Sequence, residues 1–302
     1  MYVAGTPEWK LPSISVEQLK SQAPQQVSAA QIKLNYGLVY FTSSLGFYAL
    51  WASFHDIGLS TLLTFSVLIQ SLALVCLLTA ILTRRSVVGI SALSIGMQAL
   101  SFFLRLGSTC WLRGYIPVDS TGDCLYQLAD VFAFSVCCLI VYLCTHKFKS
   151  TYDESCDQFP VYPTVIGCLI AAALVHPDLN NRPFFDGLWA SSLYVDVMST
   201  MPQLYMIHKQ EGKVDALSAH YVFLVAVSRA MDTVFWYFGF EELAPENGGF
   251  NISGCTVLGA NLLHMALISD FVYSYVKNVL AGKVMHRQFD FASNEKVVLD
   301  VV

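Results

Sequence analysis

Charged side chains are scarce in this chain of 302 residues: only 13% are charged, whereas soluble domains carry about 25%. No run of like charges occurs and the formal net charge at pH 7 is −5, which together exclude an electrostatic nucleic-acid binder. The chain also lacks HExxH, GxSxG, P-loop and paired-histidine metal motifs, so hydrolytic and phosphoryl-transfer chemistry has no visible residues. We therefore expect neither an enzyme nor a resident metal or cofactor.

Cysteine pairs and a signal peptide are missing as well. The nine cysteines contain no CxxC pair and are odd in number, which argues against a zinc site or a disulfide scaffold. Cys110 and Cys124 flank one loop and could pair if that loop faces an oxidising lumen. Residues 1–34 are polar and lack the apolar core of a secretory signal.

Apolar residues make up 55% of the chain and the mean hydropathy is +0.53. They gather in segments of about 20 residues, the length that crosses roughly 30 Å of hydrocarbon as a helix. We expect an all-α membrane protein with about eight transmembrane helices, placed at residues 35–53, 60–82, 87–105, 123–145, 161–176, 187–207, 217–238 and 253–276. The chain then divides into a cytosolic tail (1–34), an extra N-terminal helix and loop (35–59), a seven-helix domain (60–283) and a cytosolic C-terminal tail (284–302).

Basic residues in the connections predict the orientation, because the cytosolic side of a membrane protein holds the excess of Lys and Arg. Thirteen of the seventeen lie on one side of the predicted spans, and only Arg113 and Arg182 lie on the other. An even number of spans then places both termini in the cytosol. The opposite side is rich in Asp and Glu and carries the sequon Asn251-Ile252-Ser253, which fits a lumen.

A few ionisable residues fall inside the predicted spans, where such residues are rare and usually face a cavity. They are Arg105, Asp130, Asp196, Arg229, Asp232, His264 and Asp270. At 1.5 Å per helical residue, most of them reach the lumenal half of the bilayer, and Asp196 and Arg229 reach similar depths. This pattern predicts a polar cleft open to the lumen. The alternative is that the charges only tie helices together as buried ion pairs.

Two arginines in one cleft suit a ligand with a carboxylate, because a guanidinium binds a carboxylate through two parallel hydrogen bonds. Trp189, one helical turn from Asp186 at the predicted cleft mouth, could stack on a ligand side chain whose cation pairs with Asp186. Trp189 could equally be an aromatic residue of the membrane interface.

Several motifs resemble the KDEL receptor family over about residues 60–283. They are Lys147-Phe148-Lys149-Ser150-Thr151-Tyr152-Asp153, Asp157, Phe159, Leu188-Trp189, Pro202-Gln203-Leu204, His220-Tyr221, Arg229, Asp270-Phe271, Tyr273, Tyr275 and Lys277. The resemblance implies a seven-helix core of the PQ-loop or SWEET type, built from two three-helix repeats, to which this chain adds one N-terminal span. The chain looks most like the N-terminally extended, divergent branch of the family.

The resemblance also implies a function. Family members bind C-terminal Lys/His-Asp-Glu-Leu signals in the acidic Golgi and release them at neutral pH in the endoplasmic reticulum, and coat proteins carry the loaded receptor back. By position, Arg105 and Arg229 match arginines of the peptide cavity, Asp186 and Trp189 match residues that receive the signal's first side chain, and Asp196 matches a Glu. Trp236 and Asp270 match as well, and Asp232 stands beside Arg229 where the family has a Tyr.

The chain departs from the family at other cavity positions. The family's first-helix Arg and His fall at Leu63 and Gln70, and the acidic residue after the third-helix Arg falls at Ser108. A second flanking Tyr falls at Ser228, and a lumenal Arg falls at Gly239. Loss of the His removes the family's pH switch. His264 is then either a relocated sensor or a helix-packing residue.

We therefore expect a receptor in the endoplasmic reticulum and Golgi membranes that binds retention signals, with vesicle coat machinery, recruited through Lys277 and Lys283, as its cytosolic partner. Two alternatives stay open. One is a small-solute transporter of the PQ-loop type, in which Pro202-Gln203 acts as a hinge. The other is a trafficking scaffold for which the two lysines matter and the arginines do not.

Overall fold

The computed structural model describes residues 59–110, 123–179, 181–209, 213–244, 248–280 and 288–290. The predicted N-terminal tail, the extra helix at 35–53, Lys283 and all of the C-terminal tail except residues 288–290 lie outside the described residues.

The described chain is almost entirely helical, as the apolar segments predict. Its α-helices are α3 (Leu59–Arg84), α4 (Ala92–Thr109), α5 (Asp123–Tyr142), α6 (Val161–Leu174), α7 (Pro183–Ser199), α8 (Met201–Lys209), α9 (Ala216–Phe238) and α10 (Ile252–Leu280). A π-helical turn, η2 (Leu143–Lys147), extends α5, and short 3-10 turns η3 (Lys149–Thr151) and η4 (Glu241–Leu243) lie in the connections. Two three-residue strands, β1 (Lys213–Asp215) and β2 (Gln288–Asp290), pair antiparallel with Val214 opposite Phe289.

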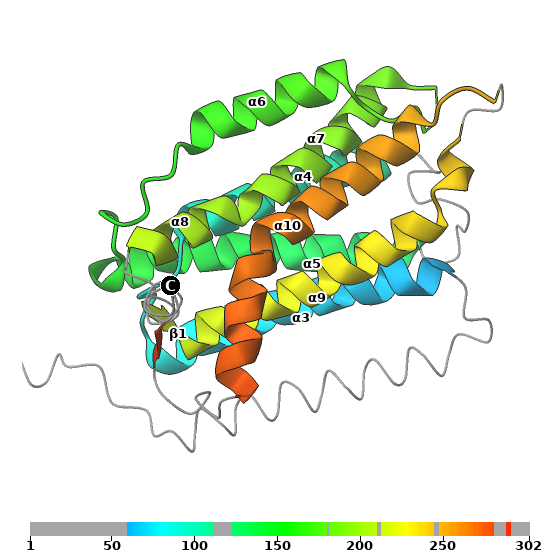
Figure 1. Ribbon diagram of the computed structural model, residues 1–302. Helices are drawn as coiled ribbons and strands as arrows, with labels where there is room; N and C mark the ends of the chain where they lie inside the picture. The colour runs from blue at the N-terminus through cyan, green and yellow to red at the C-terminus, as the bar shows by residue number, and fades with distance from the viewer. Residues whose placement is uncertain are drawn as a thin grey trace, which may run out of the picture.

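The long helices lie side by side in one bundle, with α6 on its outside against α7 (Figure 1). The most extensive packing joins α3 to α9 and α4 to α7. We call α3–α5 the first half and α7–α10 the second half. If α3 corresponds to α7 and α4 corresponds to α9, the contact of α3 with α9 is equivalent to the contact of α7 with α4. Two repeats that pack against each other produce this arrangement.

The start of α4 differs from the sequence-based expectation, which placed a helix over 87–105. The helix begins at Ala92, after the side chain of Ser91 accepts a hydrogen bond from the Ser94 N–H at 3.0 Å. Val87 and Ile90 are buried in the preceding turn. Because these residues are apolar, the predicted span began too early and included a segment that is buried but not helical.

The span predicted over 187–207 is two helices, α7 and α8, with a break at Thr200. Pro202 lacks an N–H, so it is tolerated at the start of a helix and not in its interior. The Gln203 side chain next to it accepts a hydrogen bond from the Ser91 N–H and donates one to the Gly89 carbonyl, both at 2.9 Å. The helix is thus interrupted just before Pro202, and Gln203 fastens this position to the turn between α3 and α4.

The two ends of the bundle differ in charge as the topology predicts. Arg84, Lys147 and Lys209 end α3, η2 and α8 at one end, and hydrogen bonds such as Val87 N–H to Thr151 Oγ1 at 3.0 Å join the connections there. Glu241 and Glu242 lie in the connection at the opposite end. Following the predicted orientation, we call the first end cytosolic and the second lumenal.

Among the described helices, three segments are long and apolar enough by themselves to cross a membrane: Leu62–Arg84, Leu125–Lys147 and Ile252–Lys277. The apolar helix α6 is shorter. Helices α4, α5, α7 and α9 turn their charged side chains inward, whereas Asp270 on α10 is exposed. A large apolar core, including Leu77, Ile95 and Ile140, fills the cytosolic half beneath them.

The lumenal start of α10 is tightly packed around Gly254. Asn251 caps the helix, because its Oδ1 accepts from the Gly254 N–H at 2.7 Å while its Nδ2 donates to the Phe240 carbonyl at 2.6 Å. The amide nitrogen of the sequon is therefore engaged within the fold. A methyl group on Gly254 would lie 2.5 Å from Asn251 Nδ2, whereas one on Gly259 would meet nothing within 4 Å.

Gly254→Ala is expected to destabilise the protein by about 1–3 kcal/mol, because overpacking displaces the Asn251 cap. Gly259→Ala in the same helix is the matched control and should leave the thermal unfolding midpoint unchanged or slightly raised. Thermal denaturation of detergent-solubilised protein measures both variants. Equal midpoints for the two variants would contradict the packing described here.

Candidate functional site

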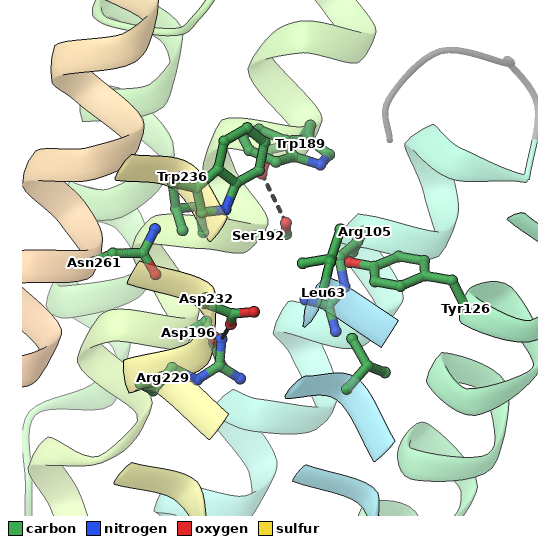
Figure 2. Close-up of a pocket in the computed structure, with 12 residues that line it drawn as sticks. Leu63, Arg105, Tyr126, Trp189, Ser192, Asp196, Arg229, Asp232, Trp236 and Asn261 are labelled. Carbon is green, nitrogen blue, oxygen red and sulfur yellow. Dashed lines mark hydrogen bonds and ion pairs between the residues drawn. The ribbon is translucent and has the colours of Figure 1, made fainter. Parts of the chain in front are cut away.

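A polar cavity opens among the lumenal halves of the helices (Figure 2). Its empty space, including the open mouth, is about 510 Å³, and the volume open to the centre of a water molecule is about 30 Å³. Both halves of the bundle contribute to its wall. The lining residues are Leu63 and Val67 of α3, Arg105 of α4, Tyr126 of α5, Trp189, Ser192, Leu193 and Asp196 of α7, Arg229, Asp232 and Trp236 of α9, and Asn261 of α10.

Arg229 is the deepest cation of this cavity, with a side chain only 3% exposed. Its Nη1 lies 2.8 Å from Asp196 Oδ2 and 2.8 Å from Asp232 Oδ2. Asp232 reaches it because residues three apart share one face of a helix, and Asp196 reaches it from α7 at the depth that the sequence predicts. The Nε and Nη2 atoms of Arg229 have no hydrogen-bond partner among the described residues.

Arg105 is bound differently. Its Nε donates to Asp130 Oδ2 at 2.8 Å and its Nη2 donates to Asp130 Oδ1 at 2.7 Å, a two-point pair with a carboxylate that is fully buried. The guanidinium also lies over the rings of Phe102 and Tyr126, at 5.1 and 5.4 Å from their centroids. These contacts fix Arg105 on three sides.

Aromatic side chains form another part of the cavity wall. Trp189 and Trp236 meet edge to face, with ring centroids 5.7 Å apart and planes at 72°, and Phe235 packs against Trp236 in turn. Figure 2 shows the two indoles above the Arg229 cluster. Because Trp189 is only 6% exposed, it is a residue of the protein interior and not an aromatic residue of the membrane interface.

Other residues singled out from the sequence lie outside the cavity lining. Asp186 is 1% exposed and its Oδ2 accepts from the Arg182 N–H at 3.2 Å at the start of α7. His264 is buried in α10, and its Nε2 has no hydrogen-bond partner among the described residues. Asp270 and Lys277 are exposed on the later turns of α10.

At the positions where the chain departs from the family, mostly uncharged side chains complete the packing. Leu63 lines the cavity, and Gln70, about two helical turns further along α3, is buried. Ser228 is joined to Ser66, whose hydroxyl donates to the Ser228 carbonyl at 2.9 Å and lies 3.0 Å from its Oγ. Among these positions, Asp232 alone introduces a charged side chain, and its carboxylate contacts Arg229.

Sequence reasoning missed Tyr126, Ser192 and Asn261 as lining residues. Tyr126 carried a usable signal, since it lies four residues before Asp130 and therefore on the same face of α5. Ser192 and Asn261 are uncharged and their neighbours give no such cue. The pairing of Cys110 with Cys124 also stays a prediction: Cys110 is an exposed free thiol, and the Cys124 side chain lies outside the described residues.

A second polar cluster lies at the cytosolic end, where Asp157 is buried. Its Oδ1 accepts from the Ser91 hydroxyl at 2.7 Å, and its Oδ2 accepts from the Leu93 N–H at 3.2 Å and the Tyr152 hydroxyl at 2.6 Å. Burial, and then the hydrogen bond to Asp157, raise the pKa of the Tyr152 phenol. The cluster fastens the connection between α5 and α6 to the start of α4.

Known proteins are similar over most of this chain. A family model described as ER lumen protein retaining receptor matches residues 86–239. ER lumen protein-retaining receptor 2 of Homo sapiens is 32% identical over 214 residues, which cover 70% of this chain and 91% of that receptor. The receptors 2 of Xenopus laevis and Gallus gallus are each 31% identical over the same coverage.

Proposed function

Because the chain belongs to the family of ER lumen protein-retaining receptors, we propose that it binds C-terminal retention signals of the Lys-Asp-Glu-Leu or His-Asp-Glu-Leu type in its lumenal cavity. In this role it retrieves lumenal proteins from the Golgi to the endoplasmic reticulum. The chain is a multi-pass membrane protein of these two compartments. Its family consists of receptors.

The observation that carries the proposal is the state of Arg229. It is a buried cation in an open cavity, and two of its donor atoms have no partner among the described residues. A buried charged donor without an acceptor is costly, and a peptide carboxylate is an acceptor of the right charge and geometry. A chain end that finishes in leucine would bring a carboxylate together with an apolar side chain for the tryptophan wall.

We assign ligand-contacting or ligand-orienting roles to the residues that the sequence singled out. They are Arg105, Arg229, Asp186, Trp189, Asp196, Trp236 and Asp232. Trp189 and Trp236 supply apolar surface, and the arginines supply positive charge. Asp186 is buried outside the cavity lining, three residues before Trp189 in the first turn of α7, so we propose that its negative charge attracts the basic first residue of a signal without direct contact.

Binding of a labelled His-Asp-Glu-Leu peptide is expected to be tighter at pH 5.5 than at 7.4. Arg229 with Asp196 and Asp232 carries a formal charge of minus one, and a ligand carboxylate would make it minus two unless a proton is taken up. Proton uptake on binding strengthens affinity as the pH falls, by at most about tenfold per pH unit for one proton. Equilibrium binding to purified protein across this pH range measures the slope.

A peptide with an amidated C terminus is the control and should bind weakly at every pH, because it lacks the terminal carboxylate. Absence of binding by the free-acid peptide at both pH values would contradict the proposed function. Replacing His264 by glutamine tests whether this buried residue contributes. An unchanged pH slope in that variant assigns His264 to helix packing, and a lost slope makes it the sensor.

The transporter alternative has less support, because the hydrogen bonds of Gln203 hold its proposed hinge to the turn between α3 and α4. It predicts solute uptake into proteoliposomes, whereas the receptor predicts none. For the cytosolic face we propose coat recruitment through Lys277, which is exposed on α10, and Lys283. We also propose that residues 60–283 form the receptor domain and that residues 1–34, 35–59 and 284–302 are additions to it.

A further inference from the structure

Two connections at the cytosolic end of the bundle lie against each other. The turn after α3 and the connection after α5 are joined by the hydrogen bond from the Val87 N–H to Thr151 Oγ1 at 3.0 Å. The buried Asp157 carboxylate fastens the second connection to Ser91 as well. Basic side chains are exposed on both connections, and we call them the basic cluster. They are Arg85 of the turn, His146 and Lys147 of η2, and Lys149 of η3.

Arg85 has a backbone conformation that is unusual for its residue type. Its φ is +51°, in the left-handed region, which is unfavourable for a residue with a Cβ atom. The residue that leaves a helix in this conformation is usually glycine or asparagine. Glycine would therefore fit the backbone after α3 with less strain. The chain instead places an exposed guanidinium there, which indicates a use for this side chain beyond the fold.

The other basic side chains lie where a membrane-length segment ends. The segment Leu125–Lys147 is long and apolar enough to cross a membrane, and its last turn is the π-helical η2, a rare structure that is frequent at functional sites. The ring of His146 stacks on that of Tyr142, with centroids 5.2 Å apart and planes at 17°. Tyr142 is exposed on the outer side of α5. The basic cluster therefore lies at the boundary between hydrocarbon and cytosol.

Exposed apolar side chains adjoin the basic cluster. Leu82, in the last turn of α3, and Val88, three residues after Arg85, are 47% and 60% exposed. An apolar surface that ends in a group of cations matches the edge of a bilayer, where acyl chains end and headgroups begin. A soluble anion would use only the cations of this surface, whereas a lipid would use both parts.

The charges of the basic cluster are mostly available to a ligand. Lys149 Nζ lies 3.4 Å from Glu154 Oε1, but both side chains are largely exposed, and such pairs are weak. Arg85 and Lys147 form no ion pair with the residues that the structure describes. The cytosolic leaflet of a membrane carries anionic lipids, which attract basic residues at its surface.

We propose that the basic cluster binds the headgroup of an anionic phospholipid of the cytosolic leaflet, with preference for a headgroup that carries a phosphate monoester, while Leu82 and Val88 contact the acyl chains. A monoester carries about two negative charges at neutral pH. Arg85 binds it through two parallel hydrogen bonds, and the two lysines add charge. This site lies at the opposite end of the bundle from the lumenal cavity, so it stands or fails independently of peptide binding.

The test measures lipid retention by the unaltered full-length protein. The protein is reconstituted in phosphatidylcholine with added phosphatidylinositol monophosphate or phosphatidylserine, and native mass spectrometry counts the lipids that stay bound after release into detergent. We expect the monophosphate to be retained above both other lipids. Inorganic phosphate at the concentration of the lipid should not displace it. Equal retention of the monophosphate and phosphatidylcholine, or displacement by inorganic phosphate, would overturn the proposal.

Variants separate the cluster from the general positive charge of this end. Arg85→Gly should retain the monophosphate about fivefold less, the effect of one cation near a membrane surface. Its thermal midpoint should be unchanged or slightly raised, because glycine fits this φ. Glu154→Gln should increase retention, because it removes the acidic competitor of Lys149. Lys209→Gln, on an exposed lysine at the end of α8, is the matched control. Equal losses in Lys209→Gln and Arg85→Gly would show that only overall charge matters and would overturn the assignment.

Discussion

Replacing Arg229 by alanine is expected to abolish binding of the free-acid peptide, a loss of at least about a hundredfold. The residue supplies the buried guanidinium of the cavity, and its Nε and Nη2 have no hydrogen-bond partner among the described residues. Truncating one partner of a buried charged contact costs about 2–5 kcal/mol in binding. Pulldown with an immobilised peptide gives a first measurement, and equilibrium titration gives the magnitude.

Arg229→Ala also leaves Asp196 and Asp232 without their cation, which destabilises the fold by about 3–5 kcal/mol. Arg229→Lys therefore accompanies it, because lysine keeps the charge and lacks the two-point edge. It should bind at least about tenfold more weakly while the thermal midpoint stays near that of the unaltered protein. Arg182→Ala, on an exposed residue of the lumenal side, is the matched control. Unchanged pulldown in both Arg229 variants would remove this residue from the site.

Replacing Asp157 by alanine is expected to cause the largest loss of stability outside the cavity, about 3 kcal/mol or more. The Asp157 carboxylate accepts from the Ser91 hydroxyl, the Leu93 N–H and the Tyr152 hydroxyl. Hydrogen bonds to a charged acceptor contribute about 1.5–3 kcal/mol each, and donors left buried without an acceptor add to the loss. The thermal unfolding midpoint of detergent-solubilised protein measures the effect.

Asp153→Ala provides the comparison, because Asp153 lies in the same connection and is exposed. Its carboxylate accepts hydrogen bonds within its own turn, among them those from the N–H and the hydroxyl of Ser155. We expect a change within about 0.5 kcal/mol for this variant. A midpoint shift as large as that of Asp157→Ala would mean that the whole connection, and not the Asp157 carboxylate, stabilises the start of α4.

The helices with continuous apolar runs are those that could be predicted well from sequence. α3 matches its predicted segment to within two residues at each end, because membrane-length apolar runs have few alternative structures. α4 begins five residues later than predicted, because the Ser91 cap and not the first apolar residue marks its start. The break between α7 and α8 was signalled by Pro202, although its hydrogen bonds to a distant turn were not.

The candidate site, too, could be predicted from the sequence only in part. Depth along each helix predicted that Asp196 and Arg229 meet, and they do. Which edge of each arginine is occupied depends on the rotation of α4, α5 and α9 about their axes, and no sequence period fixes that to the required precision. The burial of Asp186 and its hydrogen bond to the Arg182 N–H could not be predicted either. The same residue pattern is compatible with an exposed first turn of α7.

The division of the bundle into two halves has a consequence for movement. Each half neutralises its own arginine: Arg105 pairs with Asp130 in the first half, and Arg229 pairs with Asp196 and Asp232 in the second. Side-chain hydrogen bonds between uncharged groups also join the two halves, among them Ser66 to Ser228, Ser94 to the Ser199 carbonyl, Ser101 to the Ser192 carbonyl and Tyr221 to Gln98. A displacement of one half against the other would therefore leave each arginine with the aspartates that it contacts directly.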